Sequence, residues 1–160
     1  MRRFDGLILT VAIASSLALG AGCGRLEVHH EWVVDPPPGA AEAMAIVAAV
    51  YDMKTIPTVY FYGAEFLNCG DGYAYKDQAG TCVRGDQENG VIILAYWPGM
   101  KFSDIAPGNE WPWVSDLPHE FAHEASDQRG EGGCADHKCH WYEHGGEGQQ
   151  ATEALAGAGL

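Results

Sequence analysis

Two short runs of β-branched and aromatic residues set limits on the fold of this chain. Residues 58–62 (TVYFY) and 91–97 (VIILAYW) are each bounded by Gly and Pro, as buried or half-buried strands often are. Residues 40–53 (AAEAMAIVAAVYDM) are rich in Ala, lack Gly and Pro, and are apolar almost all round. This composition predicts a helix packed well into the core. The chain therefore combines helix and sheet.

The length and charge of the chain narrow its class. It has 160 residues, enough for one ordinary domain, and 47% of them are hydrophobic, so it can bury a core. Its formal net charge is −13, from 9 Lys and Arg against 22 Asp and Glu. Such a balance argues against a phosphate backbone as the main partner. We expect a monomer that does not bind nucleic acid.

The first residues have the pattern of an export signal. Arg2 and Arg3 precede an apolar stretch at 7–21, which is too short to cross a bilayer as a helix. Small residues then lead into Cys23, and this arrangement resembles the processing box of bacterial lipoproteins, although Leu19 stands four places before the Cys rather than the usual three. The resemblance implies a signal peptide at 1–22, lipidation of Cys23 and attachment to a membrane of the cell envelope. The alternative is an ordinary cleaved signal with a periplasmic or secreted product.

The rest of the chain divides into three parts. Residues 23–39 contain three consecutive prolines, and we interpret them as a stiff tether. A domain at 40–146 follows. The tail at 147–160 is small and polar with little apolar content, which predicts disorder.

The five cysteines fit an oxidising compartment. If Cys23 carries lipid, four remain, and proximity in the sequence favours pairing Cys69 with Cys82 and Cys134 with Cys139, although three connectivities are possible. A disulfide in the first pair would close the acidic, Gly-rich loop at 63–90.

Three aspartates in that loop are candidate calcium ligands. Asp71, Asp77 and Asp86 do not follow the alternate spacing of EF-hand ligands. We interpret the segment as a solvated acidic loop.

The segment at 115–126 contains the candidate metal-binding and catalytic residues. Ser115 is a capping-type residue and Pro118 is tolerated in a first turn, so a helix is expected. His119, Glu120 and His123 lie on it in the order HEFAH. This sequence resembles the HExxH pattern of zincin-type zinc metallopeptidases. The alternative is an ordinary helix with two surface histidines.

The spacing has a physical reason. Residues i and i+4 lie on the same face of a helix, so the imidazoles of His119 and His123 can bind one Zn²⁺ ion. Glu120 is turned by about 100° along the helix and falls beside the position of a water molecule at the metal. It is the candidate general base.

A zincin needs a third protein ligand. The metzincin pattern would place Gly at 126 and His at 129, but the chain has Ser126 and Arg129, which excludes that subfamily. Our prediction for the third ligand is His137, because a disulfide between the flanking cysteines would fix its backbone. His140 and Glu143 are the alternatives; Glu143 would match the gluzincin type.

Two further interpretations stay open in this region. Cys134, His137, Cys139 and His140 could form a separate structural zinc site, although export favours a disulfide. In addition, Asp136 could orient a ligand imidazole, and His140, Tyr142 and His144 could stabilise an oxyanion.

The resemblance implies an α+β fold: a backing helix, a short mixed sheet and an active-site helix. Zincins pair an edge strand with extended substrate, and 91–97 is the candidate for that strand here. Four aromatic residues are candidates for lining the cleft: Tyr96, Trp97, Trp111 and Trp113.

The implied function is that of an exported zinc metallopeptidase that hydrolyses peptide or protein substrates. The alternative is a non-catalytic zinc-binding lipoprotein on a degenerate peptidase scaffold. The presence of Glu120 favours catalysis, because a degenerate site often loses the base while keeping its histidines.

Overall fold

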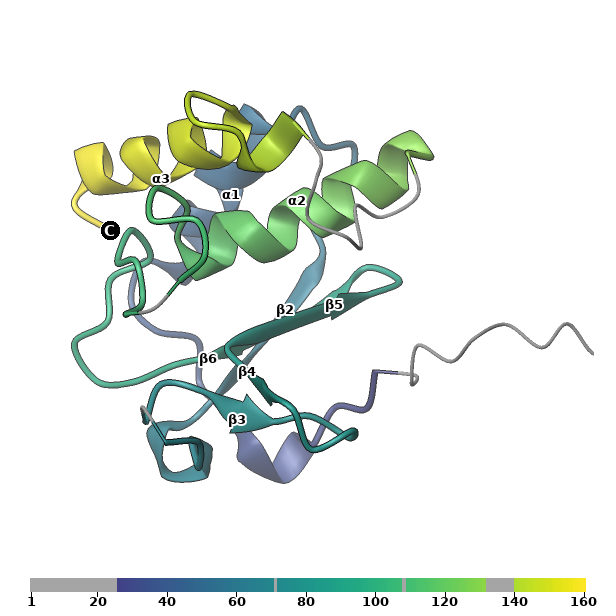
Figure 1. The fold of residues 1–160 in the computed structure, drawn as a ribbon. Coiled ribbons are helices and arrows are strands. Elements are labelled where there is room, and N and C mark those ends of the chain that lie inside the picture. Colours follow the sequence, from purple (N-terminus) through teal and green to yellow (C-terminus); the bar gives the residue numbers. More distant parts are fainter. Residues whose placement is uncertain (1–25, 71, 108, 132–139) are drawn as a thin grey trace, which may run out of the picture.

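The computed structural model describes residues 26–70, 72–107, 109–131 and 140–160. These residues form the α+β fold expected from the sequence, with three α-helices, a four-stranded mixed sheet and a two-stranded sheet. Helix α2 lies against one face of the four-stranded sheet, and α1 and α3 pack behind it (Figure 1). The small sheet lies on the opposite face (Figure 1). The four-stranded sheet is therefore the middle layer.

The larger sheet has the strand order β1-β2-β6-β5. Strands β2 and β6 are parallel, with Phe61 opposite Leu94, whereas β1 and β5 are antiparallel to their neighbours. The two strands predicted at 58–62 and 91–97 are confirmed, and the second ends at Ala95. The bounds of the strands are β1 Val33–Val34, β2 Thr58–Tyr62, β5 Gly85–Glu88 and β6 Val91–Ala95.

The position of β6 corrects the prediction that 91–97 is the edge strand. β6 is an inner strand that is buried on both faces: Ile92 and Leu94 pack against the helices, while Ile93 and Ala95 pack toward the small sheet. A continuous apolar run is typical of a strand covered on both sides. The edge strand beside α2 is the polar β5.

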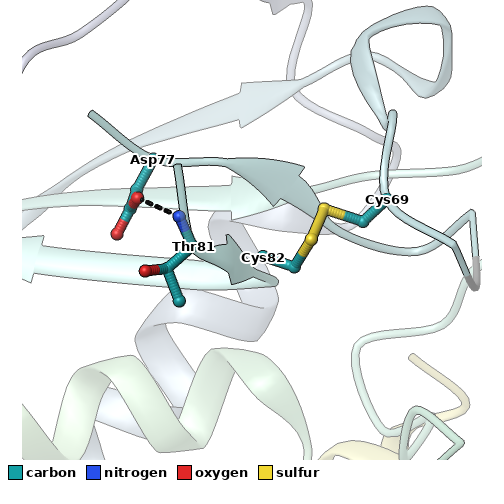
Figure 2. The surroundings of a disulfide bond; sticks show 4 residues. All are labelled: Cys69, Asp77, Thr81 and Cys82. Carbon is teal, nitrogen blue, oxygen red and sulfur yellow. Dashed lines mark hydrogen bonds between the residues drawn. A yellow bond between two sulfur atoms is a disulfide. The ribbon is translucent and has the colours of Figure 1, made fainter. Parts of the chain in front are cut away.

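The small sheet belongs to a disulfide-closed loop. β3 (Tyr75–Lys76) and β4 (Cys82–Val83) pair antiparallel. The predicted disulfide between Cys69 and Cys82 is confirmed (Figure 2). Cys134 and Cys139 lie outside the described residues, so their pairing stays a prediction.

The helices α1 (Ala40–Val50) and α2 (Asp116–Arg129) confirm two predicted helices. α1 ends earlier than expected, at Val50 instead of 53. α2 continues past 126 and ends at Arg129. Gly130 follows it, and its φ of 73° is the left-handed conformation that favours glycine.

The prediction of a disordered tail at 147–160 is wrong, because this segment forms α3 (Glu147–Ala158) against α1 and α2. Its buried side is made of small residues: Gly148, Ala151 and Thr152, together with Leu155. A Cβ at Gly148 would lie 2.7 Å from the carbonyl oxygen of Trp141. Small residues on the buried side let α3 pack closely against its neighbours, and for this reason the segment has a low apolar content.

Part of the segment predicted as a tether, 23–39, instead lies in the sheet. Val33 and Val34 form β1 and pair with β2. Trp32 just before them stacks on Phe66 and meets the ring of Tyr62 edge to face. Aromatic contacts of this kind hold an extended segment against the fold.

The predicted signal peptide at 1–22 and Cys23 lie outside the described residues. Within the part of the chain that the structure does describe, every helix is too short or too polar to cross a membrane.

Candidate metal centre

Helix α2 brings the three motif residues together. One potential ligand atom from each of His119, Glu120 and His123 lies within 4.8 Å of the others. Among the described residues this is the one group of three or more His, Cys, Asp or Glu side chains close enough to hold a metal ion. The i and i+4 spacing places both imidazoles on the same face, as the sequence predicts.

One face of α2 is buried in the core, and this explains why the two histidines on its other side are partly exposed. Leu117, Phe121 and Ala125 recur every four residues and are buried in the main core, which fixes the rotation of the helix. His119 retains 16% of its side-chain exposure and His123 is also partly exposed. The imidazoles therefore lie at the rim of the core and are partly exposed.

Glu120 is buried against the edge strand. It is 6% exposed, and its side chain lies over Gly85 of β5 so closely that a Cβ at Gly85 would lie 2.7 Å from the Glu120 Cδ atom. Burial raises the pKa of Glu120 well above its usual range, and the charges of Asp86 and Asp116 raise it further, while Arg84 lowers it. One Glu120 carboxylate oxygen lies 3.9 Å from His119 Nε2.

A partly buried ion pair flanks Glu120. Arg84 Nε donates to Asp116 Oδ1 at 3.3 Å. Burial raises the pKa of Asp116, and Arg84 opposes that shift. Arg84 thus places positive charge beside two buried carboxyl groups, those of Asp116 and Glu120.

Aromatic rings enclose His119. The rings of Trp111 and Tyr142 lie 5.3 Å and 5.0 Å from its imidazole, centroid to centroid. The Tyr142 hydroxyl group donates to the His119 carbonyl oxygen at 3.1 Å, and the Tyr142 ring lies 6.0 Å from that of His123. Tyr142 therefore packs beside both imidazoles and is hydrogen-bonded to the backbone of α2 at His119. In this way it helps to hold both imidazoles.

The other predicted aromatic residues lie elsewhere. Tyr96 packs on Phe61, and Trp97 packs on Tyr73. Trp113 meets the ring of His144 and donates through Nε1 to the Tyr142 carbonyl oxygen. Of the four aromatic residues proposed to line the cleft, Trp111 is the one with a ring contact to a motif histidine.

The structure does not identify which candidate residue is the third ligand. His137 and Asp136 lie outside the described residues, and so does the side chain of His140. Glu143 is exposed and does not join the motif residues in a metal-binding group. His144 is also exposed and does not join that group.

A second carboxylate of α2 ties the helix to β5 and β6. Glu124 accepts hydrogen bonds from the Gly90 backbone N–H at 3.0 Å and from Gln87 Nε2 at 2.7 Å. Gly90 lies in the turn between β5 and β6, so this residue sets the distance between helix and edge strand. Neither Glu124 nor Gly85 was predicted from the sequence. The repeat of Glu at 120 and 124 on one helix face was the available signal.

The donor set fits a metal ion. Two imidazoles and one carboxylate, presented at the rim of a core, match the ligands that first-row transition metals take in proteins. The arrangement can also move protons, because a buried carboxyl group with a raised pKa lies beside the histidines. No family model, curated protein or solved structure matches this chain.

Proposed function

We propose that the protein is a zinc-dependent metallopeptidase-like hydrolase of peptide bonds. The observation that supports this most strongly is the position of Glu120, buried beside two partly exposed histidines of the same helix. When bound by His119 and His123, Zn²⁺ would supply Lewis-acid polarisation of a scissile carbonyl and would lower the pKa of water.

In this proposal the protein residues perform the proton transfers and the positioning. Glu120 accepts a proton from the attacking water and delivers it to the leaving amine. Burial raises the pKa of Glu120 well above its usual range and so increases its affinity for a proton. Tyr142 and Trp111 keep His119 in place.

The substrate strand would pair with β5. β5 is one of the two edge strands of the larger sheet and contacts α2. An extended peptide can add to such an edge through backbone hydrogen bonds. This places the scissile bond along β5, next to the histidines. The proposal thereby moves the substrate-binding edge from 91–97 to Gly85–Glu88.

Replacing Glu120 with Gln tests the role of the base. We expect Glu120→Gln to retain zinc and to hydrolyse a mixture of peptides at least about a hundredfold more slowly. Glu153→Gln changes an exposed glutamate of α3 and is the matched control. Unchanged hydrolysis in Glu120→Gln would remove Glu120 from this role.

A non-catalytic metal-binding function is the second candidate. A carboxylate oxygen of Glu120 falls within the same 4.8 Å group as the imidazole nitrogens, so Glu120 can serve as a metal ligand instead of a base. In that case Glu120→Gln would weaken zinc binding strongly, and the unsubstituted protein would not hydrolyse peptides.

His137 remains the proposed third ligand, with His140 and Glu143 as alternatives. The exposed position of Glu143 speaks against it. We expect His137→Ala to lower zinc affinity more than His140→Ala. The reverse order would transfer the assignment to His140.

Export and lipid attachment are likewise proposed from the sequence of the first residues. We expect a Cys23→Ser precursor to leave the membrane fraction of a bacterial host. A membrane pool that persists in this variant would point to another tether.

A further inference from the structure

A second concave site lies on the other side of the edge strand from the metal centre. It is a cavity of about 90 Å³ between the N-terminal segment, the β3-β4 loop and β5. We call it the acidic pocket. Its lining includes three carboxylates and two tyrosines, together with one lysine and one histidine: Glu27, Asp77, Asp86, Tyr62, Tyr75, Lys76 and His29.

The acidic pocket holds carboxylates without basic partners. Among the described residues, no Lys or Arg forms a salt bridge with Glu27, Asp77 or Asp86. Asp86 accepts one hydrogen bond, from the neighbouring Gln87 N–H at 2.9 Å. Burial raises the pKa of Asp86, and the charges of Asp77 and Glu88 raise it further. The described lining thus carries three carboxylates against one lysine, Lys76, which forms no salt bridge with them.

Tyr75 supplies an independent sign of a missing ligand. The residue is 3% exposed and lines the pocket. Its hydroxyl group is buried and lacks a hydrogen-bond partner in the described part of the chain. Leaving a buried polar group unsatisfied costs free energy. A ligand N–H donor that reaches this oxygen would satisfy it.

The shape of the site favours an organic cation over a metal ion. Glu27, Asp77 and Asp86 do not bring three ligand atoms together as the motif residues do. The rings of Tyr62 and Tyr75 meet edge to face at 4.9 Å between centroids and form an aromatic wall. Such a wall suits an alkyl stem and attracts a cation. Asp77 is held in the disulfide-closed loop by the Thr81 N–H, which donates to it at 2.7 Å (Figure 2).

The position of the pocket connects it to β5. Successive side chains of a strand point to opposite faces. Gly85 and Gln87 face α2, where they meet Glu120 and Glu124. Asp86 faces the other way, into the acidic pocket. In a peptide paired with β5, alternate side chains would therefore point to the metal centre and to the pocket.

We propose that the acidic pocket binds an alkylammonium or guanidinium group, and that in a peptide paired with β5 this group is a Lys or Arg side chain. The second part rests on the proposed peptidase function. The first part stands on the pocket alone.

The first part is tested without metal or hydrolysis. The protein is titrated with n-butylammonium chloride, and binding is followed by NMR. We expect saturable binding, weakened at least about tenfold in Asp86→Asn because a charged hydrogen-bond partner is lost. Tyr75→Phe should also weaken it. Glu42→Gln removes one negative charge from an exposed position on α1 and should change affinity less than about twofold.

Three results would overturn the first part. They are the absence of binding, equal weakening by Asp86→Asn and Glu42→Gln, and equal affinity for sodium butyrate. Preferential, Asp86-dependent binding of Ca²⁺ would also overturn it, since the pocket would then be a metal site.

Peptides test the second part and separate a substrate side chain from a free amine. Two extended peptides differ at one position, with Lys in one and norleucine in the other. We expect the Lys peptide to bind at least about tenfold more tightly, with the preference lost in Asp86→Asn. If n-butylammonium binds through Asp86 but the peptides bind equally, the pocket takes a free amine and the substrate assignment is wrong. Failure of hydrolysis alone leaves both binding results interpretable.

Discussion

Gly85 lies directly beneath the carboxyl group of Glu120, and a methyl group at Gly85 would overlap the Glu120 side chain. The edge strand can approach the motif helix because it carries no side chain at this point. The position of the candidate base is therefore set by two elements that are far apart in the sequence.

Substitution of Gly85 tests this relationship. We expect Gly85→Ala to lower the free energy of unfolding by about 1–3 kcal/mol, because it overpacks a filled site. Hydrolysis should fall more than zinc affinity, since Glu120 must move while the imidazoles need not. A Cβ at Gly70 would meet no atom within 4 Å, so Gly70→Ala is the control. Equal stability and activity of the two variants would contradict this reading.

Glu124 holds the turn between β5 and β6 against α2. We expect Glu124→Ala to lower the free energy of unfolding by about 1–3 kcal/mol, because the Gly90 N–H loses its acceptor. Asp127→Ala removes a longer contact of 3.2 Å to the same Gln87 side chain and should cost less. Denaturant unfolding of both variants measures the difference. Equal losses would show that Glu124 has no special role in placing the edge strand.

The raised pKa of Asp86 predicts that the free energy of unfolding depends on pH. Its folded pKa is raised by burial and by the charges of Asp77 and Glu88, while His123 opposes the shift; Asp86 in turn raises the pKa of Glu120. As pH rises through the window between the unfolded and the folded pKa, the unfolded chain loses its proton first, and the fold loses stability.

Asp86→Asn removes this penalty. We expect the variant to be more stable than the original protein at about pH 7, and the difference to shrink as the pH falls through about 4 to about 3, because the carboxyl group then becomes protonated in the unfolded state as well. Unfolding curves at about pH 7 and about pH 3 measure it. A variant that is less stable at neutral pH would contradict the prediction. A gain in stability combined with loss of cation binding would mark Asp86 as a functional residue.

The disulfide between Cys69 and Cys82 closes a loop with a sequence separation of 13. A loop of that size predicts a loss of about 3 kcal/mol when both cysteines become Ser. The double Ser variant is preferable to a reducing agent, which would also break any bond between Cys134 and Cys139. An unchanged denaturation midpoint would show that the loop is ordered without its covalent link.

The sequence predicted the elements with strong local signals. The Ala-rich segment predicted α1, and the β-branched runs predicted β2 and β6. The capping residue and the histidine spacing predicted α2. Local periodicity and turn residues are sufficient for such elements. The pairing of Cys69 with Cys82 also followed from short separation.

What the sequence did not predict depends on tertiary contacts. β5 reads GDQE and has no strand pattern of its own; it becomes a strand by pairing with β6. The small residues of α3 have little apolar surface, so their packing against Trp141 and Val114 is visible only in three dimensions. The closeness of Gly85 to Glu120, and of Tyr75 to Asp86, also requires the fold.

Zinc content per chain tests the central proposal most directly. The protein is purified, loaded with zinc and dialysed, and it is compared with a His119→Ala and His123→Ala double variant. The control replaces two other histidines, His29 and His30, with Ala. We expect about one zinc per chain in the original protein and in the control, and none in the motif variant. Equal zinc in the motif variant, or none in the original protein, would contradict the metal centre and with it the proposed hydrolase.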